Sequence, residues 1–154
     1  MTIEDDLRTL GAVPGITGAV LRATEARAVS PVPLGDRIRL HPATVGATAA
    51  FVRARSIDIA TEPHLAAAAA ARLPGAQLHP TSPATTMVRV DSALIAAHPD
   101  EVHDQLLRAL DWRAHGPRWT LHSQSGASAS AALAVPACCP LGHQLSANGT
   151  CFCD

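Results

Sequence analysis

The residues best suited to chemistry lie near the end of the chain, in the stretch ACCPLGHQLSANGTCFCD. All four cysteines of the protein, Cys138, Cys139, Cys151 and Cys153, occur there within sixteen residues, together with His143. Cysteines clustered in this way bind a metal ion, form disulfides or undergo covalent modification. The functional interpretation of the sequence therefore depends on this stretch.

The first interpretation is a metal site. The segment CCPLGHQL resembles the first knuckle of a zinc ribbon, in which a Cys-Pro-x-Cys-Gly-His-x-Leu pattern turns the chain around the ion. The second cysteine of that pattern is missing here, and His143 would be its substitute. The Asn148-Gly149 pair favours a tight hairpin, which would return the two distal cysteines to the knuckle. The predicted ligands are Cys139, His143, Cys151 and Cys153, with Cys138 as an alternative.

The spacing of the thiols is compatible with two different metal ions. Cys151 and Cys153 form a C-x-C pair, one residue shorter than the usual C-x-x-C spacing of zinc sites. Adjacent thiols at Cys138 and Cys139 and a C-x-C pair suit the softer Cu(I) ion as well as Zn(II). We therefore expect a thiophilic ion, either zinc or copper(I).

A second interpretation treats the same residues as substrates of modifying enzymes. Residues 120–153 include no Asp, Glu, Lys or Arg. An uncharged C-terminus with Ser, Thr and Cys resembles the core of a lanthipeptide precursor, in which dehydrated serine and threonine accept cysteine thiolates. Thr150 with Cys153, and Ser146 with Cys151, have workable spacings for such rings. The N-terminal part of the chain would then be the leader of a ribosomally made, modified peptide.

The residues before the cysteines show no catalytic pattern. Ser125 and Ser128 lack the strand-to-helix turn of a hydrolase nucleophile. The glycines of GAVPGITG do not have the spacing of a phosphate-binding loop. Glu62, Asp91 and Asp111 show no pairing that suggests acid–base catalysis. An enzyme is therefore not expected, although an unrecognised type of enzyme stays open, as does a tail without a specific role.

The histidines outside the tail give no firm site either. His41, His79 and His98 each precede a proline, which favours extended or turn backbone. We expect solvated or hydrogen-bonded roles for them at the surface. A site that combines His41 and His79 in the folded protein stays open.

The amino-acid composition of the chain indicates in which compartment the protein functions and which classes of partner are not expected. The net charge is −1, so no basic face for nucleic acid is expected. The chain has no stretch of 18 apolar residues that would span a membrane. The N-terminus, MTIEDDLRTL, is acidic and does not resemble a signal peptide. We therefore expect a cytoplasmic protein with reduced thiols, which disfavours disulfides.

Local signals predict the elements that carry this tail. Thr2 caps a short helix that Gly11 ends. The segment VPGITG predicts a turn. Strands are expected in ARAVS, RIRLH and ATAAFVRARSIDIA. In the last of these, Phe51, Ile57 and Ile59 alternate with polar residues.

The second half of this region adds two helices and a strand. Thr61 is the predicted N-cap of a helix over the alanine run, which a Pro-Gly pair ends. A loop with Pro80 and Pro83 then leads to the strand TTMVRVD. The clearest helix is HPDEVHDQLLRALDWR, whose apolar face comprises Val102, Leu106, Leu107 and Leu110. This order predicts an α+β fold, a small and mainly antiparallel sheet with helices on one face.

The chain divides into three parts by composition. Residues 1–119 are the predicted α+β domain. Residues 120–137 are rich in Ser, Ala and Gly and predict a flexible linker. Residues 138–154 are the cysteine-rich C-terminal tail.

Three segments within residues 10–113 share a pattern with a known family: VPGIT, ARSIDIATEPHLAAAAAARLPGAQLHP, and TTMVRVDS with DEVHDQLLRALDWR. With these segments, the region resembles the small luciferase-like domains of bacteria. In that family an opening turn precedes strands, and a helix, a His-Pro segment, a strand and a closing helix with paired leucines follow. The resemblance implies a compact α+β fold and supplies no catalytic residues.

Overall fold

The computed structural model describes residues 1–116 of the chain. Their strands are β1 (Val29–Pro33), β2 (Ile38–Pro42), β3 (Ala50–Val52), β4 (Ser56–Thr61), β5 (Gln77–Ser82) and β6 (Thr85–Asp91). Their helices are α1 (Ile3–Leu10), α2 (Pro14–Ala26), α3 (Ala66–Arg72), α4 (Ser92–Ala97) and α5 (Pro99–His115), with a 3-10 turn η1 (Pro63–Leu65) before α3.

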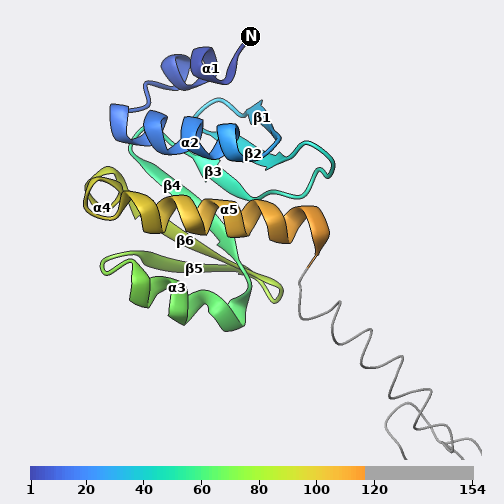
Figure 1. Cartoon of the computed structure of the whole chain (residues 1–154), viewed down its shortest axis with the longest axis vertical. Helices are drawn as coiled ribbons and strands as arrows, with labels where there is room; N and C mark the ends of the chain where they lie inside the picture. The colour runs from blue at the N-terminus through green and yellow to red at the C-terminus, as the bar shows by residue number, and fades with distance from the viewer. Residues whose placement is uncertain (117–154) are drawn as a thin grey trace, which may run out of the picture. The chain divides into compact units, whose positions relative to one another are not determined.

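The strands form one antiparallel sheet in the order β1-β2-β3-β4-β6-β5 (Figure 1). Helices α2 and α5 run across the same face of this sheet (Figure 1). Side chains alternate between the two faces of a strand, so Ile57 and Ile59 face these helices and Asp58 faces away. The predicted α+β fold, with an antiparallel sheet and helices on one face, is confirmed.

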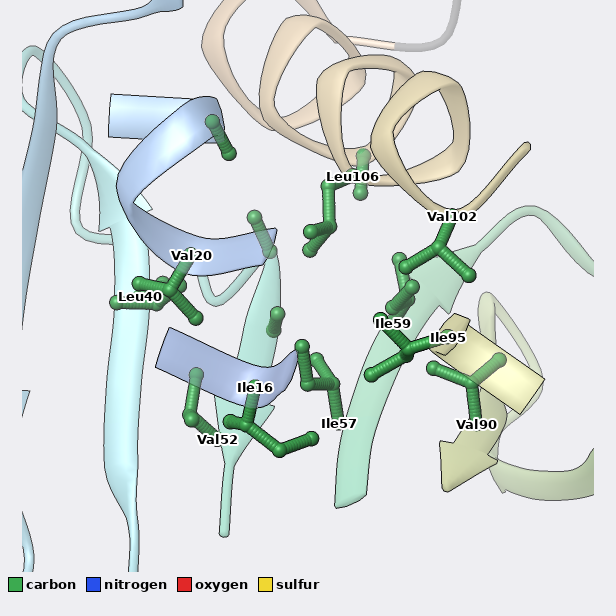
Figure 2. Close-up of a cluster of buried hydrophobic side chains, with 14 of the residues drawn as sticks. Ile16, Val20, Leu40, Val52, Ile57, Ile59, Val90, Ile95, Val102 and Leu106 are labelled. Carbon is green, nitrogen blue, oxygen red and sulfur yellow. The ribbon is translucent and has the colours of Figure 1, made fainter. Parts of the chain in front are cut away.

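The core fills the space between that face of the sheet and the helices. Figure 2 shows Ile16 and Val20 of α2 and Leu106 of α5 in one apolar cluster with strand side chains. Most of these aliphatic side chains are fully enclosed, and burying each one contributes about 1.5–3 kcal/mol. Aliphatic rather than aromatic packing therefore holds the domain together.

The first helix begins and ends where the sequence predicts. The Thr2 side chain accepts a hydrogen bond from the backbone N–H of Asp5, and the Asp5 carboxylate accepts one from the backbone N–H of Thr2. This capping box satisfies two N–H groups at the start of α1. Gly11 ends the helix in the left-handed conformation, with φ of 70°, which glycine adopts without strain.

The predicted turn at VPGITG is wrong, because Pro14 opens helix α2 there. Proline suits the first position of a helix, where its missing N–H would have no partner. Ile16, Val20 and Ala23 follow at helical spacing and are fully buried. The strand predicted at ARAVS consequently starts later, at Val29.

The long strand predicted over ATAAFVRARSIDIA is also wrong, because it folds back on itself as the hairpin β3–β4. The backbone N–H of Arg53 donates to the carbonyl of Ser56 at 2.8 Å and closes the turn. Phe51 pairs with Asp58 across the hairpin, so it lies on the face opposite to Ile57 and Ile59. The turn thus breaks the alternation that the sequence suggested.

Two further predictions near the second helix need correction. Thr61 is not a helix cap but the last residue of β4, and Glu62 is the N-cap of the 3-10 turn that leads into α3. The predicted loop around Pro80 is the strand β5 at the edge of the sheet. Edge strands tolerate proline because one side of the strand needs no ladder hydrogen bonds.

The closing helix α5 agrees with the prediction except at one position. Val102, Leu106 and Leu110 are buried against the core as expected. Leu107 is only partly buried, and Gln105 takes a place on the buried face instead. Within residues 1–116, none of the helices combines the length and the apolar character needed to cross a membrane.

Candidate functional site

The residues that the sequence nominates for function lie outside the described part of the chain. They are Cys138, Cys139, His143, Ser146, Thr150, Cys151 and Cys153. The zinc or copper(I) site and the modification sites therefore stay predictions, as do the linker and tail boundaries. Within residues 1–116, no group of three or more His, Cys, Asp or Glu side chains is placed to hold an ion.

The possible pairing of His41 and His79 is wrong. His41 lies on β2 and His79 on β5, and three strands separate them in the sheet. Four strand spacings amount to roughly 19 Å, far beyond the reach of two imidazoles that share an ion. The Nδ1 atom of His41 instead lies 2.9 Å from the carbonyl oxygen of Pro42.

A pocket of about 140 Å³ lies where β4 leads into η1 and α3, alongside α5. Its lining comprises Ala60, Thr61, Glu62, Leu65, Ala68, Ala69, Arg72, Gln105, Arg108, Ala109 and Trp112. The members from α5 recur at helical spacing, so one face of that helix forms a wall. Four of the lining residues are alanines, whose small side chains leave the space open.

Two polar residues with buried atoms, Gln105 and Glu62, belong to the lining of the pocket. Gln105 is 7% exposed, and its side chain belongs to the lining of the pocket. Glu62 also lines the pocket, and its Oε1 atom is buried without a hydrogen-bond partner among residues 1–116. Buried polar groups are nearly always hydrogen-bonded in folded proteins, so the Oε1 atom of Glu62 is unusual.

Two arginines bring positive charge to the same pocket. Arg72 of α3 and Arg108 of α5 are exposed, and neither forms an ion pair with the described residues. Most other arginines of the domain bind a carboxylate, as Arg27 does with Asp111 at 2.7 Å. The pocket thus combines two unpaired guanidinium groups with one unpaired carboxylate.

Trp112, the aromatic residue of the pocket lining, is in contact with the side chain of the next residue on α5. The guanidinium of Arg113 lies 3.8 Å from the centre of the Trp112 ring. Its Nε atom donates to the carbonyl of Thr48 at 2.8 Å, and its Nη2 atom donates to the hydroxyl of Thr85 at 2.9 Å. Burial lowers the pKa of Arg113, since it disfavours the charged form. The C-terminal end of α5 is thereby fixed to the sheet.

The opposite face of the sheet carries an ion-pair network around Asp58. Both carboxylate oxygens accept from Arg89, with Nε to Oδ1 at 2.6 Å and Nη2 to Oδ2 at 3.0 Å. Arg53 approaches the same carboxylate at 3.5 Å and also binds Asp36 at 3.0 Å. Burial of Asp58 opposes ionisation, but Arg89 and Arg53 outweigh it and hold the pKa of Asp58 below its usual range.

The sequence contained only one signal of the pocket. Gln105 interrupts the apolar face of the closing helix, between Val102 and Ala109, and a polar residue at such a position needs an explanation. Glu62 had no visible partner in the sequence, and the structure shows none within the described residues. Asp91 and Asp111 do have roles, since Asp91 caps α4 and Asp111 binds Arg27.

Comparison of the chain with models of protein families, with curated proteins and with solved structures gives no match. The resemblance to luciferase-like domains and the resemblance of the tail to a zinc-ribbon knuckle therefore stay predictions.

Proposed function

We propose that this protein is a small non-enzymatic α+β domain that carries a Cys/His segment for one thiophilic ion, Zn(II) or Cu(I). The observation that carries the proposal is that the thiols are clustered in the sequence and that none belongs to the described domain. Residues 1–116 build a complete core without any cysteine, and all four cysteines lie within sixteen residues of one later segment. Four thiols clustered in one short segment favour the binding of a single ion.

The proposed ligand set is Cys139, His143, Cys151 and Cys153, with Cys138 as the alternative. Thiolate and imidazole ligands suit zinc, and a high proportion of thiolates suits copper(I). The turn proposed at Asn148-Gly149 shortens the path between the two cysteine pairs. Because the thiols must stay reduced to bind the ion, the proposed setting is the cytoplasm. With balanced charges on the chain, no nucleic-acid partner is proposed.

A modified-peptide precursor is the second candidate, and one observation favours it. The described domain ends before a charge-free stretch, residues 120–153, in which Ser146 and Thr150 stand near Cys151 and Cys153. A folded leader followed by such a core would present these residues to dehydrating and cyclising enzymes. Those enzymes would then be the partners of the chain.

The proposal is tested by the metal content of the full chain with reduced thiols. After dialysis against zinc, or against copper(I) under anaerobic conditions, we expect about one ion per chain. The double replacement Cys151→Ser and Cys153→Ser should abolish uptake, whereas Ser146→Ala should leave it unchanged. Affinity should weaken below about pH 6, because protons then compete for thiolate and imidazole. A wild-type chain that takes up neither ion contradicts the proposal.

A further inference from the structure

The volume and the lining of the pocket between β4, α3 and α5 indicate the kind of ligand that fits it. Its volume of about 140 Å³ is close to the roughly 150 Å³ that holds a benzene-sized molecule. Alanines 60, 68, 69 and 109, with Leu65 and Trp112, give most of it an apolar lining. A compact apolar group therefore fits inside.

The charges at the pocket specify the rest of the ligand. The guanidinium groups of Arg72 and Arg108 have no carboxylate partner among residues 1–116, and such groups bind carboxylates through paired hydrogen bonds. The carboxylate of Glu62 has no donor partner there either. One ligand that carries a carboxylate and an ammonium group would satisfy both charges at once.

From this arrangement we infer that the pocket binds a small free amino acid with an aliphatic side chain. The ligand carboxylate pairs with Arg72 and Arg108, and the ammonium group pairs with Glu62. The amide of Gln105, which is nine-tenths buried and has both a donor and an acceptor to offer, binds the polar part of the ligand.

A simple anion is a poorer match than a zwitterion. Glu62 would repel a ligand that carries negative charge alone, and its carboxylate would remain without a donor. A ligand with positive charge alone would be repelled by Arg72 and Arg108, and their guanidinium groups would remain without an acceptor. The two kinds of charge at one pocket thus distinguish amino acids from both single-charge relatives.

Three probes of matched shape separate these possibilities. They are L-leucine, 4-methylpentanoate, which lacks the amino group, and 3-methylbutylamine, which lacks the carboxylate. Calorimetric titration of the full chain, reduced and free of metal, should show saturable binding of leucine. Each single-charge probe should bind at least about tenfold more weakly, the equivalent of about 1.4 kcal/mol per lost interaction.

Variants test which residues are responsible. Replacing Arg72→Gln together with Arg108→Gln should weaken leucine binding at least about tenfold. The matched control is Arg55→Gln, which removes another exposed arginine without an ion pair among the described residues and should leave the affinity unchanged. Glu62→Gln should reduce the preference for leucine over 4-methylpentanoate at least about tenfold. Ala68→Leu should block binding, because it fills the pocket from an exposed position.

The inference is overturned if leucine shows no saturable binding up to about 10 mM. Equal affinities for leucine and 4-methylpentanoate, or leucine binding that survives both arginine replacements, would also overturn it. None of the described residues that line the pocket is a cysteine, and the test contains no metal, so its outcome is independent of the function proposed for the tail.

Discussion

Asp58 is the residue whose environment departs most from that of a surface carboxylate. It lies on the sheet face away from the helices, is 5% exposed, and receives two hydrogen bonds from one guanidinium. Paired hydrogen bonds of this type are among the stronger polar interactions in proteins. They join β4 to its neighbour β6, where Asp58 and Arg89 are directly opposite each other. The pair therefore fixes the register of these two strands.

Replacing Asp58 by asparagine should destabilise the domain in a pH-dependent way. At neutral pH we expect a loss of about 1–3 kcal/mol, since hydrogen bonds to a charged group are lost. The pKa of Asp58 is lowered in the folded state, so its contribution is complete above the unfolded pKa of about 3.9. That contribution is lost as the pH falls through the folded pKa. Urea unfolding of wild type and Asp58→Asn between about pH 2 and pH 7 measures this difference.

The two stability curves should run parallel above about pH 5 and converge at lower pH. The other carboxylates are common to both proteins, so their titration cancels in the difference. A difference that stays constant down to about pH 2 would show that the ionised form of Asp58 contributes nothing to folding.

Helix α5 is the element that links the core to the pocket. One face buries Val102, Leu106 and Leu110, and the neighbouring face carries Gln105 and Trp112 into the pocket. Arg113 then attaches the last turn to the carbonyl of Thr48 and the hydroxyl of Thr85. Loss of packing along this helix should therefore affect both the stability and the pocket.

Leu106→Ala should lower the free energy of unfolding by about 2–5 kcal/mol, because Leu106 is fully buried and its removal leaves a cavity. The matched control is Leu107→Ala, one residue further along the same helix and only partly buried. It should cost less than half as much. Denaturant unfolding of the two variants measures the difference. Equal costs would contradict the orientation of α5 on the sheet.

Elements with strong local signals were predictable from the sequence. The capping box at Thr2, the stop at Gly11 and the apolar face of α5 each depend on residues close together in the chain. Helix α2 was not predicted, because Pro14 and the following Gly15 are also typical of turns. The segment forms a helix because Ile16, Val20 and Ala23 are then buried in the core, which the local sequence does not reveal.

Long-range structure explains the other differences. Pro80 is acceptable in β5 because that strand lies at the edge of the sheet, which local sequence does not reveal. The hairpin between β3 and β4 moves Phe51 to the face opposite to Ile57, and no proline or glycine marks its turn. The pocket is built from segments around residues 60–72 and 105–112, so the sequence hints at it only through the polar Gln105 on the apolar face of α5.

At the scale of the whole molecule, a domain with its own core precedes a segment that holds every cysteine of the sequence. Within residues 1–116, the buried core cluster extends from Leu7 to Leu110 and contains side chains of both the helices and the sheet. Folding and ion binding should therefore be separable properties of the chain.

A chain that ends at Trp119 should keep the thermal midpoint of the full-length protein within about 2 °C, a shift that corresponds to well under 1 kcal/mol. It should also lose ion uptake completely, because it lacks the five proposed ligands. Thermal unfolding by circular dichroism, with both proteins reduced and free of metal, gives the comparison. A much lower midpoint for the shorter chain would show that the later residues contribute to the fold.

The central claim, that the cysteine segment holds one ion in its unmodified form, is tested most directly by the mass of the protein from its native host. The intact mass is measured under native conditions and again after denaturation with a chelator. We expect a native mass that exceeds the mass calculated from the sequence by one zinc or copper ion, and a denatured mass that equals the calculated mass. A denatured mass short by one or more water molecules would contradict it and favour the modified-peptide precursor. A native mass without an ion, with the thiols reduced, would contradict it as well.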